Sequence, residues 1–173
     1  ANARMIATDL LAQAEHDVLA QAILVTPSDA LAQAVRAEVD VQRRQLSRAD
    51  VLEASIARSR ILRVADLETA IEVSNAYAPE HLILQVANAR RWLERVTSAG
   101  SVFLGEWTPE PMGDYCSGTN HVLPTYGYAR ACSGLSLLDF VKRITVQEIS
   151  PAGLRDLGPT AVILAGLEGL DAH

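Results

Sequence analysis

The chain has 173 residues, of which 49% are apolar, and its 15 Lys and Arg against 21 Asp and Glu give a formal net charge of −6. This length and apolar content predict one folded domain, with at most a small appendage. The absence of a basic run argues against a nucleic-acid partner, and no apolar stretch approaches the about 18 residues that a membrane span needs. Two cysteines and no signal-peptide pattern favour a reducing cytoplasm.

Helices and short strands alternate along the first two thirds of the chain. Apolar residues at helical spacing predict a first helix over 3–15, and the branched apolar run 22–26 predicts a buried strand. The next predicted elements are helices over 29–47 and 49–58, a strand over 61–64, a helix over 66–76, a strand over 82–86, a helix over 88–96 and a strand over 101–105. This alternation predicts an α/β fold with a mainly parallel sheet and flanking helices.

The last third of the chain predicts a different organisation. Residues 135–141 have the pattern of a helix, and 144–148 that of a strand or an extended segment. A helical tail is predicted from Ser150 to Leu170, with a break near Gly158-Pro159. We therefore divide the chain into an α/β unit over 1–145 and a C-terminal helical tail over 146–173.

A polar stretch over 113–125 follows the apolar run 102–105 and contains too much Gly, Ser, Asn and Pro to continue as helix or strand. It includes Asp114 and His121. Loops that leave the end of a buried strand are where open α/β sheets place ligand chemistry. The alternative is a polar surface connection whose Asp and Asn make local turn bonds.

The four histidines all fall in polar stretches rather than inside apolar strands; they are His16, His81, His121 and His173. Gln13 and His16 are three residues apart and share one face of the first helix. Together with Asp114 and another His, they would present nitrogen and oxygen ligands, which Zn²⁺ accepts, although Gln is an unusual donor.

Glu80 and His81 form a second candidate site. They place a carboxylate and an imidazole at the start of a predicted strand, after a proline that fixes the turn. An imidazole suits general acid–base work at neutral pH. An exposed turn without a catalytic role is the alternative.

Several separate motifs resemble histidinol dehydrogenase, and they occur in that family's order. The motifs are 13–16, 78–82, 113–125, 133–136 with 139–143 and 145–148, and 168–173. The resemblance covers essentially the whole chain. It implies that residues 1–145 form a Rossmann-like unit, one half-domain of a larger enzyme, and that 146–173 form a dimerisation tail.

The family resemblance also implies an activity. Histidinol dehydrogenases oxidise L-histidinol to L-histidine in two successive hydride transfers to NAD⁺, through the aldehyde, with a bound Zn²⁺. This is the last step of histidine biosynthesis. Because the family's N-terminal part, which carries most of the nucleotide-binding surface, is absent here, we assign no NAD-contacting residue.

The resemblance implies a role for each matching side chain. Gln13, His16 and Asp114 resemble three zinc ligands, and His173 resembles the fourth, supplied in trans within a homodimer. Glu80 and His81 resemble the catalytic pair: His81 would take the hydroxyl proton, and Glu80 would activate the water that attacks the aldehyde. The residues expected to bind substrate are Gln13, His16, His81, Asp114, His121, Glu168 and His173.

The chain is much shorter than the family's enzymes, so we expect it to be inactive alone. We expect either self-association or a complementing N-terminal chain. Two other functions stay open: a truncated α/β interaction module without catalytic competence, and a metal-dependent hydrolase or lyase that uses Asp114, His16 and His121. Cys116, beside Asp114, is interpreted as a tolerated small residue rather than a soft ligand.

Overall fold

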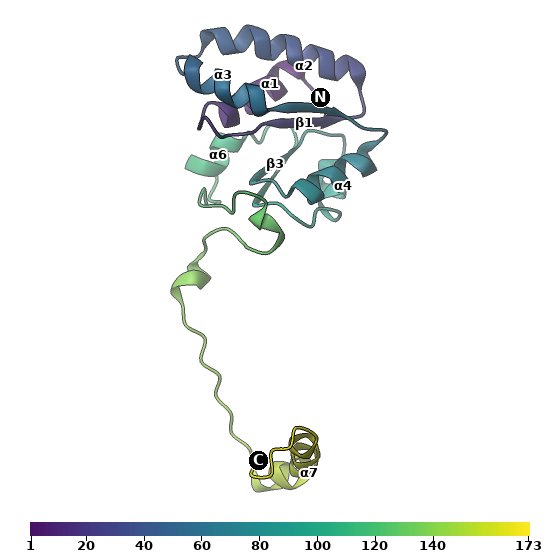
Figure 1. Cartoon of the computed structure of the whole chain (residues 1–173), viewed down its shortest axis with the longest axis vertical. Helices are drawn as coiled ribbons and strands as arrows, with labels where there is room; N and C mark the ends of the chain where they lie inside the picture. The colour runs from purple at the N-terminus through teal and green to yellow at the C-terminus, as the bar shows by residue number, and fades with distance from the viewer. The chain divides into compact units, whose positions relative to one another are not determined.

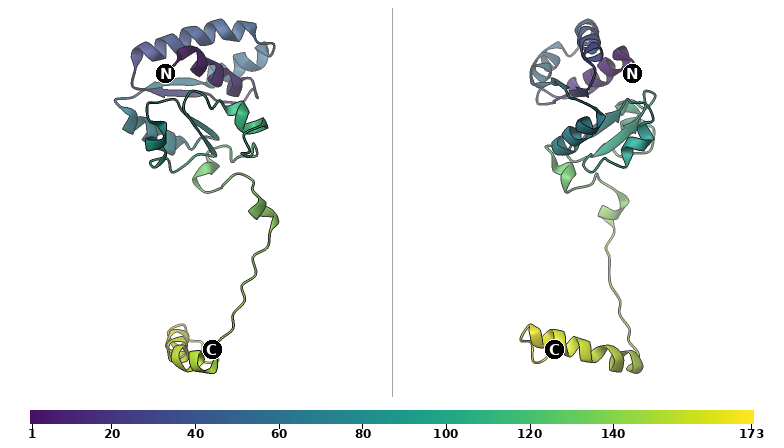
Figure 2. Two further views of the ribbon diagram at one scale, coloured as in Figure 1. Left: turned by 180° about the vertical axis from the view of Figure 1, so that it is seen from behind. Right: turned by 90° about the vertical axis from the view of Figure 1, so that its right-hand side faces the viewer.

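The computed structural model describes residues 1–173, which divide into two compact units, Ala1–Ser136 and Leu137–His173. Figures 1 and 2 show the helices and strands of each unit. The sequence places the start of the tail at 146, whereas the division in the structure follows Ser136. None of the helices combines the length and the hydrophobicity that a membrane-spanning helix requires.

The first unit alternates helices with short strands, as the sequence predicts. Its elements are α1 (Ala3–Ala14), β1 (Ile23–Thr26), α2 (Asp29–Gln42), η1 (Arg43–Gln45), α3 (Ala49–Arg58), β2 (Arg60–Arg63), α4 (Leu67–Tyr77), β3 (His81–Leu84), α5 (Ala89–Leu93), β4 (Ser101–Leu104), α6 (Glu110–Tyr115) and η2 (Tyr128–Arg130). The strands form two parallel pairs, β1 with β2 and β3 with β4. The α/β fold is confirmed, but hydrogen bonding divides the strands into two short sheets rather than one.

Side-chain caps define where the main helices begin. Asn2, Ser28 and Asp66 each accept a hydrogen bond from a backbone N–H in the first turn of α1, α2 and α4. At the other end of α4, Ala78 adopts a left-handed conformation with φ 56°. This conformation costs a non-glycine residue about 1–2 kcal/mol, and here it turns the chain directly into the start of β3.

A small apolar core holds α1 against α2 and α3. Ile6 and Ala7 of α1 pack with Val35 of α2, and Leu11 and Ala14 of α1 pack with Leu52 of α3. All six side chains are buried. The spacing of the buried positions on α1 is that of one helical face, so burial of this face fixes how the helix lies on its neighbours.

The second unit contains η3 (Leu137–Phe140) and α7 (Pro151–Leu167). The predicted helix over 135–141 is reduced to this single 3₁₀ turn, and residues 144–148 form no strand. The predicted break at Gly158-Pro159 is wrong, because α7 continues through Pro159. Proline keeps a helical φ and removes only one backbone donor, so a helix can contain it at the cost of one hydrogen bond and local crowding.

Val35 offers a direct test of the core. Replacing Val35, which is fully buried, with Ala should lower the free energy of unfolding by about 2 kcal/mol. Val41 lies on the same helix but is 56% exposed, so V41A should change stability by less than about 0.5 kcal/mol. Urea denaturation of the two variants makes the comparison, and equal losses would contradict the packing described here.

Candidate functional site

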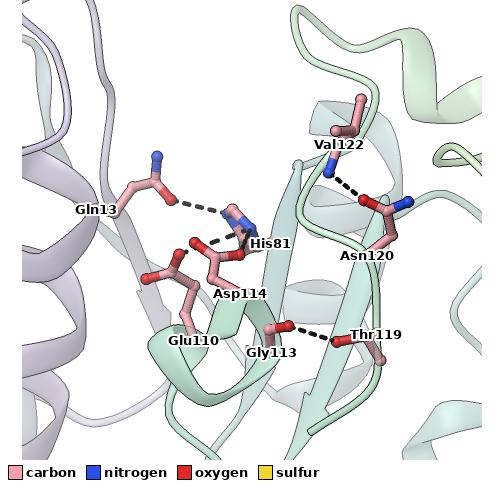
Figure 3. Close-up of polar contacts among 8 residues, drawn as sticks. All are labelled: Gln13, His81, Glu110, Gly113, Asp114, Thr119, Asn120 and Val122. Carbon is pink, nitrogen blue, oxygen red and sulfur yellow. Dashed lines mark hydrogen bonds and ion pairs between the residues drawn. The ribbon is translucent and has the colours of Figure 1, made fainter. Parts of the chain in front are cut away.

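Four polar side chains from α1, β3 and α6 converge in the first unit (Figure 3). The Gln13 Oε1 atom lies 2.9 Å from Nδ1 of His81. On the other side of the imidazole, His81 Nε2 lies 3.8 Å from Glu110 Oε1 and 3.9 Å from Asp114 Oδ1. These last distances exceed a hydrogen bond, and His81 Nε2 is buried without a hydrogen-bond partner.

The contact with Gln13 fixes the tautomer of His81. An amide oxygen can only accept, so the hydrogen must be on Nδ1 of the ring. Nε2 then presents a lone pair toward the carboxyl groups of Glu110 and Asp114. Three electron-rich atoms facing one another in a buried space repel, unless a proton or a cation lies among them.

The pKa shifts in the cluster follow mainly from burial. Burial raises the pKa of Glu110 to about 7, and the hydrogen bond and negative charge of Asp114 act in the same direction. Burial lowers the pKa of His81, against the opposing effect of the Asp114 charge. His81 is therefore neutral at pH 7, and its contacts with the two carboxyl groups are not ion pairs.

The cluster has a composition that suits a divalent cation. His81, Glu110 and Asp114 can each offer one ligand atom, and these atoms all lie within 4.8 Å of one another. A set of imidazole nitrogen and carboxylate oxygen is one that Zn²⁺ accepts. The Nε2 atom of His81, which is buried without a hydrogen-bond partner, leaves one polar atom of this space unsatisfied.

The close approach of α6 to β4 brings the two acids to His81. A Cβ atom on Gly113 would lie 2.6 Å from the ring of Phe103, so only glycine permits the helix to lie this near the strand. The same Phe103 ring lies 5.9 Å from the His81 ring, between centroids. The loop that follows α6 is held back onto it by the Thr119 hydroxyl, which donates to the Gly113 carbonyl at 3.1 Å (Figure 3).

Asp114 lies in the last turn of α6 rather than in a loop, which corrects the prediction of an irregular stretch from residue 113. The helix begins at Glu110, with Pro109 as its N-cap and Pro111 in its first turn, where a missing N–H costs nothing. Sequence reasoning missed Glu110 altogether. The signal was its spacing from Asp114, because residues four apart share a helical face once a helix is assigned.

Glu80 and His16 lie near the cluster. Glu80 is half-buried in the turn before β3, and burial raises its pKa while the charge of His16 opposes the shift. His16 follows the end of α1 and is exposed, and its backbone N–H donates to the Gln13 carbonyl at 3.3 Å. The charge of His16 also helps to lower the pKa of His81.

The other predicted site residues are not in the cluster. His121 is exposed in the loop after α6, between Asn120 and Val122. The Asn120 side chain accepts from the Val122 N–H at 2.8 Å and donates to the Leu135 carbonyl at 2.7 Å, which fixes the loop around His121. Glu168 and His173 belong to the second unit, at the end of α7 and at the last residue. Their assignments, like that of His121, stay predictions.

The comparisons with known proteins all indicate one family. A family model described as histidinol dehydrogenase matches residues 1–173. The histidinol dehydrogenase of Xanthomonas campestris pv. campestris is 56% identical over 168 residues, which are 97% of this chain and 39% of that protein. The histidinol dehydrogenase of Xylella fastidiosa is 55% identical over 173 residues, which are 100% of this chain and 40% of that protein.

A solved structure agrees with the sequence relatives. The crystal structure of histidinol dehydrogenase from Elizabethkingia anophelis matches with a TM-score of 0.97 and 44% identity, over 100% of this chain and 40% of that chain. The chain thus spans about 40% of the length of the relatives it matches.

The raised pKa of Glu110 predicts a dependence of stability on pH. Native Glu110 keeps its proton up to about pH 7, whereas an unfolded carboxyl loses it near 4.5, so the native state binds more protons between these values. The free energy of unfolding should therefore fall as the pH rises through this interval. Glu80 and Asp9 shift in the same direction and His81 in the opposite one.

The variant E110Q isolates the contribution of Glu110, because Gln keeps the shape and cannot titrate. Urea denaturation between pH 5 and pH 8, with EDTA present to exclude metal, should give a shallower fall for E110Q than for the unchanged chain. Equal slopes for the two proteins would contradict the assignment of the raised pKa to Glu110.

Proposed function

Because this chain belongs to the histidinol dehydrogenase family, we propose that it forms the catalytic-centre segment of an enzyme that oxidises L-histidinol to L-histidine, the last step of histidine biosynthesis. The reaction proposed is a four-electron oxidation through the aldehyde, with two hydrides passed to NAD⁺. The observation that supports it most is the convergence of Gln13, His81 and Asp114 in one buried cluster.

Gln13, His16 and Asp114 are the proposed zinc ligands in this chain, and the partner subunit's His173 completes the set in a homodimer. Gln13 Oε1 lies 2.9 Å from Nδ1 of His81 and Asp114 Oδ1 lies 3.9 Å from Nε2, so two of the proposed ligands lie near the same ring. A zinc ion held by these residues would bind the nitrogen atoms of histidinol and so orient the carbinol carbon. An amide, an imidazole and a carboxylate offer it only nitrogen and oxygen atoms.

His81 is the proposed base of the alcohol oxidation. Its Nδ1–H donates to Gln13, which leaves the Nε2 lone pair free to take the hydroxyl proton as the hydride departs. Burial lowers the pKa of His81, so the ring is in its basic form at neutral pH. The neighbouring Asp114 carboxylate stabilises the imidazolium that forms, since its charge favours the protonated ring.

Glu80 is the proposed base of the aldehyde oxidation. It immediately precedes His81, and burial raises its pKa, which makes the carboxylate a better proton acceptor than an exposed one. Its proposed role is to deprotonate the water that attacks the aldehyde, which gives the hydrate from which the second hydride leaves. His121 and Glu168 are proposed to bind histidinol, with the partner subunit's His173.

Further polypeptide is proposed to complete the enzyme. β1 and β3 each pair with only one other strand, and both line a cavity of about 1140 Å³ together with α4 residues. Free strand edges and a cavity with a partly apolar lining favour association with another segment. We infer that a complementing N-terminal region binds here and carries the NAD⁺ contacts, so this chain alone should be inactive.

Exposed, unpaired Cys116 and Cys132 favour a reducing, cytoplasmic location.

The zinc assignment is tested by H16A in a complete histidinol dehydrogenase that contains this region. Loss of an outer-shell partner typically weakens metal binding about 10–100-fold, so loss of a ligand should weaken it at least as much. Elemental analysis after dialysis against a chelator measures the retained zinc. The control is D17N, which changes the adjacent exposed residue and should keep its zinc. Full zinc content in H16A would remove His16 from the ligand set.

The separate roles proposed for Glu80 and His81 predict that their substitution slows different oxidation steps. E80Q in the complete enzyme should slow oxidation of histidinal about 10²–10⁴-fold, the usual contribution of a general base, and should slow histidinol oxidation less. H81N should mainly slow histidinol oxidation. Single-turnover measurements started from each substrate separate the steps, and equal losses in both steps for E80Q would exclude its proposed role.

A further inference from the structure

Glu110 is a buried acid that the proposed reaction does not use. It is 4% exposed and is the one charged residue in the buried set of the chain, whose other polar members are Thr26, Ser55 and Ser74. Burying a carboxyl group costs free energy unless the group gains partners. The residues that Glu110 faces are His81 and Asp114, two of the residues assigned above to the reaction and to zinc.

We propose that Glu110 is a positioning residue, whose carboxyl group holds the His81 ring and the Asp114 side chain in their working orientations. This inference rests on the proposed function, because it concerns how the base and the metal ligand are held. It assigns Glu110 neither a proton transfer nor a bond to the metal.

The contacts of His81 show what Glu110 adds. Gln13 holds the Nδ1 edge at 2.9 Å, and the Phe103 ring lies against the imidazole at 5.9 Å between centroids. Neither contact fixes the opposite edge of the ring. Nε2, in a side chain that is only 9% exposed, has no hydrogen-bond partner, and Glu110 Oε1 is its nearest charged neighbour at 3.8 Å. Glu110 therefore lies against the edge of the ring that Gln13 and Phe103 leave unsupported.

Asp114 is held by the same residue. Glu110 and Asp114 are four residues apart on α6, so their side chains share one helical face. The Asp114 side chain is 13% exposed and contacts the carboxyl group of Glu110. Figure 3 shows both side chains directed from α6 toward His81. With alanine at position 110, a buried space would open beside both, and each could adopt other rotamers.

The rival role for Glu110 is that of a metal ligand, since its oxygen lies in the group of atoms within 4.8 Å. A ligand and a positioning residue respond differently to substitution. Alanine at a ligand position removes the metal. Alanine at a positioning residue leaves the metal and lowers kcat more than it raises KM, and an isosteric side chain restores the rate.

The experiment compares E110A and E110Q in the full-length protein that contains this region. We expect E110A to keep its zinc and its KM for histidinol, and to lose about 10–100-fold in kcat. This is the usual effect of removing a side chain that orients a metal ligand. We expect E110Q to recover most of this rate, because Gln keeps the shape and the hydrogen-bonding capacity. A crystal structure of E110A should show the His81 ring turned or in two orientations.

Three results would overturn the inference: loss of zinc in E110A, an unchanged kcat in E110A, or a rate in E110Q as low as in E110A. The first result would make Glu110 a ligand, and the third would show that its charge matters rather than its shape. The unsubstituted enzyme distinguishes a failure of this inference from a failure of the proposed function. If it does not oxidise histidinol, the proposed function fails; if it does, only the role of Glu110 is in question.

Discussion

The registration of α1 against β3 is the constraint on which the candidate site depends. Two polar contacts join them: Gln85 donates to Asp9 at 2.6 Å, and Gln13 pairs with His81 at 2.9 Å. Asp9 and Gln13 are one helical turn apart on α1, while His81 begins β3 and Gln85 directly follows its last residue. A helix fixed at two points along a strand cannot slide without breaking a half-buried hydrogen bond, and each group left buried and unpaired would cost about 1–3 kcal/mol.

The apolar core makes these contacts possible at low cost. Ile6, Ala7, Leu11 and Ala14 bury one face of α1 against α2 and α3, and the polar residues Asp9 and Gln13 are left to face β3. Burial raises the pKa of Asp9, and its hydrogen bond from Gln85 opposes this effect. The same helix thus supplies core residues on one side and a site residue on the other.

The position of α6, which supplies Glu110 and Asp114 to the site, depends on one glycine. Because Gly113 has no side chain, α6 approaches the Phe103 ring closely, and that ring also contacts His81. A larger residue at this position would displace α6 and carry Glu110 and Asp114 away from the imidazole. Packing and the candidate site are therefore coupled, since the aromatic ring that lies against His81 also sets the position of the two acids.

Much of the fold could be predicted from local patterns. The periodicity of α1, the caps Ser28 and Asp66, and the four short apolar strands all have local causes, and they lie where the sequence places them. The motifs around Gln13, His81 and Asp114 also identified the family. Three features could not be predicted: the two separate strand pairs, the helix α6, and the continuity of α7 through Pro159.

The missed features have physical reasons. Strand pairing depends on contacts between distant segments, which one sequence does not reveal. α6 has only six residues and contains Pro and Gly, so its helix propensity is low and packing against Phe103 must stabilise it. Glu110 was missed because its importance depends on that helix. The roles of His121, Glu168 and His173 still rest on the resemblance of their motifs to the family.

The central claim, which rests on the proposed function, is that Gln13 and His16 at the end of α1 and Asp114 of α6 bind a zinc ion and that His81 does not. Anomalous diffraction at the zinc absorption edge, from crystals of a complete histidinol dehydrogenase that contains this region, tests this most directly. The account predicts one anomalous peak at about 2.0–2.2 Å from ligand atoms of Gln13, His16 and Asp114, with His81 Nε2 and Glu110 outside bonding distance. A peak bonded to His81 Nε2 and Glu110, or no peak in this cluster, would contradict it.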